Sequence, residues 1–200
     1  MRPASAGRFD SGRSNSVGAT MQAHPIYRPI APSDGASILR VHRRAILLDG
    51  VRAYSPAMVH SWADGMNADY AGRAEQSGST VEVAQLHGAV VGFCGALGNE
   101  IEGLFVDPGF AGRGIGRGLI ERAFRRMRAG GHDSAKVVAA LSGVGFYEAL
   151  GFRPVRGVRH ATRGGLVLPV LEMARGLEPV EASPPVGPLG LAALRSAGAA

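Results

Sequence analysis

The spacing of hydrophobic and polar residues predicts a strand and two helices in the first third of the chain. Residues 27–30 are predicted to form a short strand at the edge of a sheet, because Pro29 lacks the N–H that an inner strand needs. Residues 33–48 begin with a Ser-Asp pair of the kind that begins helices, and apolar side chains at helical spacing follow it. A second helix begins at the Ser-Pro pair 55–56. Residues 64–79 are expected to be irregular apart from one helical turn.

The middle of the chain has the pattern of three strands followed by a long helix. Residues 81–97 contain two apolar runs on either side of His87 and Gly88, which is typical of an antiparallel hairpin. Residues 101–106 form the third strand, which ends at an Asp-Pro-Gly turn. A glycine-rich stretch follows, and apolar residues at helical spacing then continue to about Arg128.

The last third of the chain adds three more strands and a short helix. Residues 136–141 are an apolar run of the length of a buried strand, and residues 144–150 form a helix that ends at Gly151. Residues 152–158 and 166–173 are two closing strands. This order of elements predicts an α/β protein. We expect a three-layer α/β/α sandwich with a mixed, mostly antiparallel sheet of six or seven strands.

The length of 200 residues suits one domain with tails. We expect the domain to span residues 25–175. Residues 1–24, with several serines and arginines, are expected to be a disordered extension, with Met21 as an alternative native start. Residues 176–200 are rich in Pro, Gly and Ala and are expected to be a disordered tail.

The composition excludes several classes of protein. No apolar run approaches the roughly 20 residues of a membrane span. The single cysteine, Cys94, cannot form an internal disulfide, and its apolar neighbours favour a packing role. The six histidines show no metal-binding spacing. We therefore expect a cytoplasmic protein without a metal and without a membrane partner.

The positive charge is concentrated on the long helix. The chain has a net charge of +6, and residues 113–128 hold six arginines against one glutamate. Such a helix suits either a nucleic acid or a small anionic ligand. The sequence lacks the aromatic residues interleaved with basic ones that readers of single strands use, and it shows no helix-turn-helix pattern. We therefore expect no nucleic-acid partner.

A glycine at every second position from Gly112 to Gly118 precedes this helix. The first N–H groups of a helix have no internal partner and carry partial positive charge, so they bind anions. Glycines let a phosphate approach those N–H groups. The spacing does not match the G-x-G-x-x-G dinucleotide motif, and the stretch lacks the lysine of a P-loop. The pattern therefore indicates a pyrophosphate site of another kind.

Two separate motifs resemble those of the GNAT superfamily of acetyl-CoA-dependent N-acetyltransferases. They are Leu104–Pro108 with Gly112–Leu119, and Phe146–Phe152. The resemblance covers about residues 25–175. The stretches 54–56, 61–63 and 163–165 are also similar to a bacterial branch, the YafP-type acetyltransferases.

The resemblance implies the GNAT fold and acetyl-CoA as co-substrate. It implies that backbone N–H groups of the glycine-rich loop bind the pyrophosphate, and that the edge at Phe105 and Val106 pairs with the pantetheine arm, where two strands splay apart. Ser142 stands near the position at which the superfamily often has an asparagine. The implied cofactor-binding residues are Phe105, Val106, Gly112, Arg113, Gly114, Ile115, Gly116, Arg117 and Ser142. One departure lies beside them, because Ala111 replaces the usual Gln or Arg.

The resemblance also implies catalytic roles. Tyr147 is expected to be the general acid for the departing thiolate, and the Val106 N–H is expected to polarise the thioester carbonyl. Glu102 is the candidate general base, with a chain of water molecules as the alternative. Trp62 and Tyr54 either line the acceptor side or pack between helices, and His60 and His160 are candidates to reach the acceptor.

The expected function is transfer of an acetyl group from acetyl-CoA to a primary amine of a small molecule or a protein, by direct attack in a ternary complex. The alternative is a non-catalytic acyl-CoA-binding or regulatory module. The departures from the motif of the superfamily at Ala111 and Ser142 fit this alternative. The protein is expected to be a monomer or a homodimer.

Overall fold

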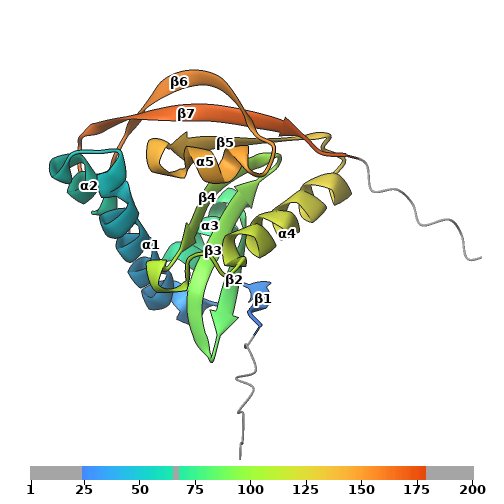
Figure 1. Cartoon of the computed structure of the whole chain (residues 1–200). Coiled ribbons are helices and arrows are strands. Elements are labelled where there is room, and N and C mark those ends of the chain that lie inside the picture. The colour runs from blue at the N-terminus through green and yellow to red at the C-terminus, as the bar shows by residue number, and fades with distance from the viewer. Residues whose placement is uncertain (1–23, 65–67, 179–200) are drawn as a thin grey trace, which may run out of the picture.

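The computed structural model describes residues 24–64 and 68–178, in which a seven-stranded sheet separates two layers of helices (Figure 1). The order of strands in the sheet is β1-β2-β3-β4-β5-β7-β6. The strands are β1 Ile26–Pro29, β2 Thr80–Leu86, β3 Ala89–Leu97, β4 Glu100–Val106, β5 Ser134–Ala140, β6 Arg153–Ala161 and β7 Val167–Gly176. The three-layer mixed sheet predicted from the sequence is confirmed.

Neighbouring strands run antiparallel except at the centre, where β4 and β5 are parallel. The β4–β5 pairing covers Glu100 with Lys136 and Ile101 with Val137, at the start of β4. Beyond this point the two strands diverge. Figure 1 shows the result, since β5, β6 and β7 cross the top of the view while β2 and β3 run down it.

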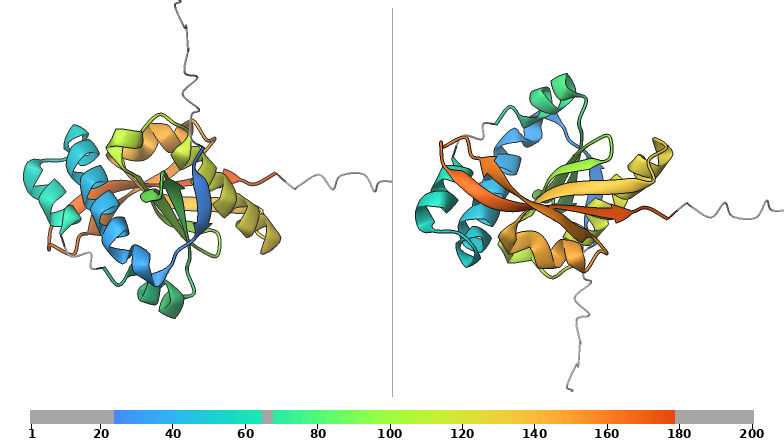
Figure 2. Two further views of the ribbon diagram at one scale, coloured as in Figure 1. Left: turned by 90° about the horizontal axis from the view of Figure 1, so that it is seen from below. Right: turned by 90° about the horizontal axis from the view of Figure 1, so that it is seen from above.

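The helices cover both faces of the sheet (Figure 2). They are α1 Gly35–Asp49, α2 Pro56–Ala63 and α3 Tyr70–Ser77 on one face, and α4 Ile115–Ala129 and α5 Val144–Glu148 on the other. The core under α4 and α5 includes Leu119, Phe124 and Phe152. The opposite core, under α1 to α3, includes Ile38 and Phe93.

Local sequence signals explain several of these boundaries. His87 and Gly88 both have positive φ, of 49° and 80°, as a tight hairpin between β2 and β3 requires. Ser55 caps α2, because its side chain accepts a hydrogen bond from the Met58 N–H at 3.4 Å. Asp34 does not cap α1. Instead its buried carboxylate accepts two hydrogen bonds from Arg28, at 2.6 and 2.9 Å, and so ties β1 to the start of α1.

Three boundaries differ from the sequence-based expectation. Residues 70–77, expected to be irregular, form α3, which Gly78 ends in the left-handed conformation with φ 74°. The helix α4 begins at Ile115, so half of the glycine run lies inside its first turn. The strand β7 reaches Gly176, and Leu177 is buried, so the folded part extends past residue 175. The rest of the expected extension and tail lies outside the described residues.

Of the helices in the described part of the chain, none has the length and hydrophobicity needed to cross a membrane.

Candidate functional site

Two pockets meet on β4. The larger, of about 690 Å³, lies where β4 and β5 diverge and is lined by both strands, the start of α4 and the residues around α5. The smaller, of about 390 Å³, lies between β4, α1, α2, α3 and the end of β6. Both are lined by Trp62, Glu102, Phe105 and His160. A molecule in one pocket would therefore reach a molecule in the other across the same short stretch of β4.

The backbone of β4 faces the larger pocket at Val106. The N–H of Asp107 donates to the carbonyl oxygen of Val91 on β3, at 2.8 Å. Since backbone groups alternate sides along an antiparallel strand, the N–H of Val106 points away from β3, toward β5. The strand β5 is no longer paired at this level. The splayed edge that the sequence led us to expect is thus present, and Phe105 and Val106 both line the pocket.

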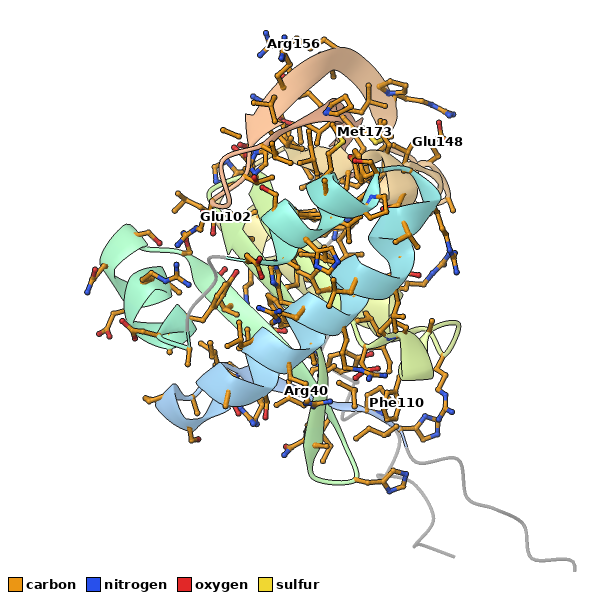
Figure 3. The ribbon with its side chains drawn as sticks, turned by 90° about the vertical axis from the view of Figure 1, so that its left-hand side faces the viewer. Arg40, Glu102, Phe110, Glu148, Arg156 and Met173 are labelled. Carbon is orange, nitrogen blue, oxygen red and sulfur yellow. The ribbon has the colours of Figure 1, made fainter. Side chains whose placement is uncertain are left out.

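Asp107 fixes the end of this edge. Its carboxylate is 3% exposed and accepts hydrogen bonds from Arg40 at 3.2 Å and Arg44 at 3.0 Å, both on α1. It also accepts one from the Gly109 N–H at 3.0 Å. Figure 3 shows Arg40 beside Phe110, in the short turn that follows. Hydrogen bonds from charged groups are worth more than neutral ones, so this buried carboxylate holds the strand end and the glycine-rich loop in place.

Glu102 owes its position to a bulge in β4. The register passes from Gly95 opposite Gly103 to Ala96 opposite Ile101, which leaves Glu102 without a partner on β3. A bulge of this kind bends a strand and redirects a side chain. A methyl group on Gly95 would lie 3.8 Å from a Glu102 carboxylate oxygen and 3.4 Å from the Tyr70 hydroxyl, so both groups lie above Gly95. Glu102 is exposed and lines both pockets, so it lies at their junction.

The four glycines of the run serve two different structural purposes. Gly112 and Gly114 have φ of 75°, a conformation that other residues rarely adopt, and they form the turn before α4. Gly116 and Gly118 lie in the helix, where a side chain would meet a neighbour. A methyl group on Gly116 would lie 3.3 Å from the Phe146 ring. One on Gly118 would overlap the Tyr27 hydroxyl, at 2.0 Å. Close packing of α4 thus accounts for the second half of the run.

The structure brings part of the predicted cofactor-binding set to the larger pocket. Phe105, Val106, Gly116 and Ser142 line it, as does Ala111. The remaining predicted residues do not line this pocket; they are Gly112, Arg113, Gly114, Ile115 and Arg117. The Ile115 side chain is buried in the core, so only its backbone is available to a ligand. Arg113 and Arg117 are exposed, and the Arg113 guanidinium lies 5.3 Å from the centre of the Phe110 ring.

Tyr147 lies on α5 and lines the larger pocket opposite β4. Burial, with a smaller contribution from Cys94, raises the pKa of its phenol, which therefore stays protonated at neutral pH. Its ring packs edge-on against the rings of Phe146 and Phe152, with 5.3 and 5.5 Å between ring centres. A fixed, protonated phenol in a pocket has the geometry and charge of a proton donor.

Tyr54 holds the segment that carries Ser142. Its hydroxyl accepts a hydrogen bond from the Leu141 N–H at 2.8 Å and donates one to the carbonyl oxygen of Pro169 at 2.9 Å. Tyr54 is buried and lines neither pocket, so of its two predicted roles the structure shows packing. Trp62, in contrast, lines both pockets. Cys94 is buried, and burial raises the pKa of its thiol to about 12, as suits a packing residue.

The smaller pocket contains residues that the sequence-based analysis missed, among them His42, Tyr70, Arg73 and Arg163. His42 is 5% exposed, contacts the Phe105 ring at 4.6 Å between centres, and has no partner for its Nδ1 within the described residues. Burial, and then the charges of Arg43 and Arg163, lower its pKa to about 4. His60 does not line the pocket. These residues come from α1, α3 and the β6–β7 turn, so no local spacing in the sequence could bring them together.

Within residues 24–64 and 68–178, no cluster of three or more His, Cys, Asp or Glu side chains is suited to hold a metal ion.

Comparison with known proteins agrees with this geometry. The model of the acetyltransferase (GNAT) domain family matches residues 77–154. An uncharacterized N-acetyltransferase, YafP, of Escherichia coli K12 is 26% identical over 137 residues, which cover 68% of this chain and 87% of that protein. The crystal structure of a GCN5-related N-acetyltransferase from Rhodopseudomonas palustris matches with a TM-score of 0.72 and 26% identity, over 78% of this chain and 97% of that one.

This chain is therefore similar to the GNAT superfamily in its central part. A PaiA N-acetyltransferase of Thermoplasma acidophilum, solved in complex with coenzyme A, has the same fold, with a TM-score of 0.62 and 19% identity over 76% of this chain and 99% of that one.

The family match covers the two pockets unequally. Residues 77–154 include β4, Gly116, β5 and α5, which line the larger pocket. Most of the residues of α1, α2 and α3 that line the smaller pocket precede this match, and His160 and Arg163 follow it. The similarity to this family therefore concerns the larger pocket more than the smaller one.

Proposed function

We propose that this protein transfers an acetyl group from acetyl-CoA to a primary amine of a small molecule or a protein. The observation that carries the proposal is the unpaired edge of β4, which faces the larger pocket opposite Tyr147. The match to the GNAT domain family and the coenzyme A in the similar Thermoplasma structure support it. The amine attacks the thioester directly while both substrates are bound, so no covalent intermediate with the enzyme is required.

The residues of the larger pocket fit an acyl-CoA. In this proposal the free edge at Phe105 and Val106 pairs with the pantetheine arm, as an added strand would. The start of α4 offers unpaired N–H groups and a positive dipole to the pyrophosphate, and Arg113 and Arg117 add charge beside it. Gly116 keeps the wall open, because a larger side chain would project toward Phe146 and Val106. Ser142 contributes a hydrogen bond from the facing wall.

Three groups of the chain act on the reacting atoms in this proposal. The Val106 N–H donates to the thioester carbonyl oxygen as negative charge develops there. Glu102, at the junction of the pockets, accepts a proton of the attacking amine through a water molecule. Tyr147 donates its proton to the sulfur. The C–N bond forms as the C–S bond breaks, and the products are an N-acetyl compound and free CoA thiol.

Ala111 lines the larger pocket at the place where a longer polar side chain is expected from the superfamily. Arg113 takes over the contact to the phosphates in this proposal, since it is exposed in the same turn. An Ala111→Gln variant is therefore expected to bind acetyl-CoA more tightly than the natural protein, while its turnover of bound acetyl-CoA stays the same.

Calorimetric titration with acetyl-CoA, followed by measurement of thiol release with a panel of amines, tests the proposed function. Saturable binding and amine-dependent thiol release are expected. No binding at millimolar acetyl-CoA would overturn both the enzymatic function and its alternative, a non-catalytic acyl-CoA-binding module. Binding without turnover of any amine would favour the alternative.

A further inference from the structure

The smaller pocket contains more positive than negative charge. Among its described lining residues, those of the Arg, Lys, Asp and Glu types are Arg73 on α3, Arg163 in the turn between β6 and β7, and Glu102. Arg73 donates from its Nε to the Asp69 carbonyl oxygen at 3.1 Å, and within the described residues no carboxylate pairs with it. Its guanidinium lies 5.7 Å from the centre of the Tyr70 ring. The arginine is therefore held in place while its charge remains unneutralised.

The three charges of the pocket all act on the Tyr70 hydroxyl. The pKa of Tyr70 is raised to about 12, chiefly by burial and then by the Glu102 charge, whereas Arg73 and Arg163 act in the opposite direction. Tyr70 and Glu102 lie above Gly95. The pocket thus has a negative group at its junction with the larger pocket and two positive groups around its rim.

The turn that carries Arg163 is fastened to α2. The Ser61 and Thr162 hydroxyls are 2.6 Å apart, the Leu166 N–H donates to the Ser61 hydroxyl at 3.1 Å, and the Gly164 N–H donates to the Ser61 carbonyl at 3.2 Å. A methyl group on Gly164 would overlap Ser61, at 2.6 Å. Because this turn is held by hydrogen bonds on both sides of Arg163, it positions that residue at the pocket.

We propose that the smaller pocket binds an amine that also carries a carboxylate, that is, an amino acid or a close analogue. This inference rests on the proposed acetyl transfer. Arg73 and Arg163 hold the carboxylate, which guanidinium groups bind through paired hydrogen bonds. The amino group then points to Glu102 and the edge of β4, and Trp62 and Tyr70 enclose the side chain. A volume of about 390 Å³ suits a small molecule.

Matched pairs of amines test this inference. Each of several L-amino acids, such as phenylalanine and leucine, is compared with the amine that lacks its carboxylate, here phenethylamine and isoamylamine. Thiol release from acetyl-CoA is expected to show a kcat/KM at least about 10-fold higher for the amino acids, which is the scale of one charge-assisted contact. Equal or better turnover of the amines that lack the carboxylate would overturn the inference and leave the proposed function standing.

Arg73→Gln is the informative variant. It is expected to raise KM for the amino acids about 10-fold, to leave KM for the amines without a carboxylate unchanged, and to leave the acetyl-CoA affinity unchanged; Arg73→Lys should restore part of the loss. Arg159→Gln, which removes an exposed arginine outside both pockets, is the matched control. An equal loss for the amino acids and for the amines without a carboxylate would contradict a carboxylate contact at Arg73.

A second readout does not require turnover. Trp62 is the protein's only tryptophan and lines both pockets, so its fluorescence reports ligands in either. Amino acids are expected to change the emission saturably, and Arg73→Gln is expected to weaken that binding. An emission change with acetyl-CoA but not with any amino acid would overturn the inference alone. No response to acetyl-CoA, together with no calorimetric binding, would overturn the proposed function instead.

Discussion

The two pockets that meet on β4 are built in different ways. Both are lined by residues from many elements, but the proposed contacts of the larger come mainly from backbone groups of β4 and the start of α4. The smaller is lined by side chains of α1, α2, α3, β2, β4, β6 and the β6–β7 turn, with an excess of arginine. Backbone contacts suit a part of the substrate that never changes, and side-chain contacts suit a part that differs between relatives. The match to the GNAT family, over residues 77–154, covers mostly the former.

The largest effect expected from a single substitution is in the larger pocket. Tyr147→Phe removes the proposed proton donor, and kcat should fall about 100-fold, the usual scale of a lost general acid. The affinity for acetyl-CoA should not change, since the ring remains. Thiol release and calorimetry measure the two quantities. Tyr27→Phe, which alters a tyrosine outside both pockets, is the control. Unchanged turnover in Tyr147→Phe would show that the chemistry does not need this hydroxyl.

The next largest expected effect is a loss of stability at acidic pH, caused by His42 in the smaller pocket. His42 has a folded-state pKa of about 4, against 6.5 when unfolded. Above pH 6.5 both states are neutral and His42 contributes nothing. As the pH falls toward 4, only the unfolded state takes up the proton, and at pH 5 this costs about 2 kcal/mol of stability. Urea unfolding at pH 7.5 and pH 5 should show this loss in the natural protein and not in His42→Phe.

The control for this measurement is His60→Phe, which changes an exposed histidine on α2. It should retain the full loss of stability between pH 7.5 and pH 5. If His42→Phe retained it as well, the buried imidazole would not be the source of the acid sensitivity.

Glu102 tests the point at which the pockets join. Glu102→Gln keeps the shape of the side chain and removes the proton acceptor, so kcat should fall about 10-fold if water carries part of the proton transfer. Glu121→Gln, on the exposed face of α4, is the matched loss of one negative charge. Equal activity of the two variants would assign proton removal to water alone.

The smallest expected effect is on the free energy of unfolding, and it tests whether close packing explains the glycine at position 118. Gly118→Ala places a methyl group against Tyr27 and should lower the free energy of unfolding by about 1 kcal/mol. Gly145→Ala, in α5, meets no atom within 4 Å and should raise it by roughly 0.5–1 kcal/mol, because alanine favours a helix. Urea unfolding compares them. A stabilised Gly118→Ala would mean that close packing does not explain this glycine.

The sequence-based predictions succeeded where the signal was local. The hairpin at His87 and Gly88, the cap at Ser55 and the order of the elements are confirmed, because turn and cap residues act within a few positions of the chain. The helix α3 was missed, although Gly78 marks its end, because a single buried residue, Ala74, gives too weak a period. Of the predicted site, Glu102, Val106 and Tyr147 do line a common pocket, and their catalytic roles remain predictions.

The sequence by itself determined the fold class, the glycine-rich turn before α4 and part of the larger pocket, on β4 and α5, because each of these depends on neighbours in the chain. Only the tertiary structure decided the rest. The divergence of β4 from β5, the bulge at Glu102 and the direction of the Val106 N–H depend on strand register. The smaller pocket depends on how α1, α2, α3 and the β6–β7 turn pack around β4. Packing brings Arg73 and Arg163, 90 residues apart, to one cavity, and no spacing in the sequence encodes that contact.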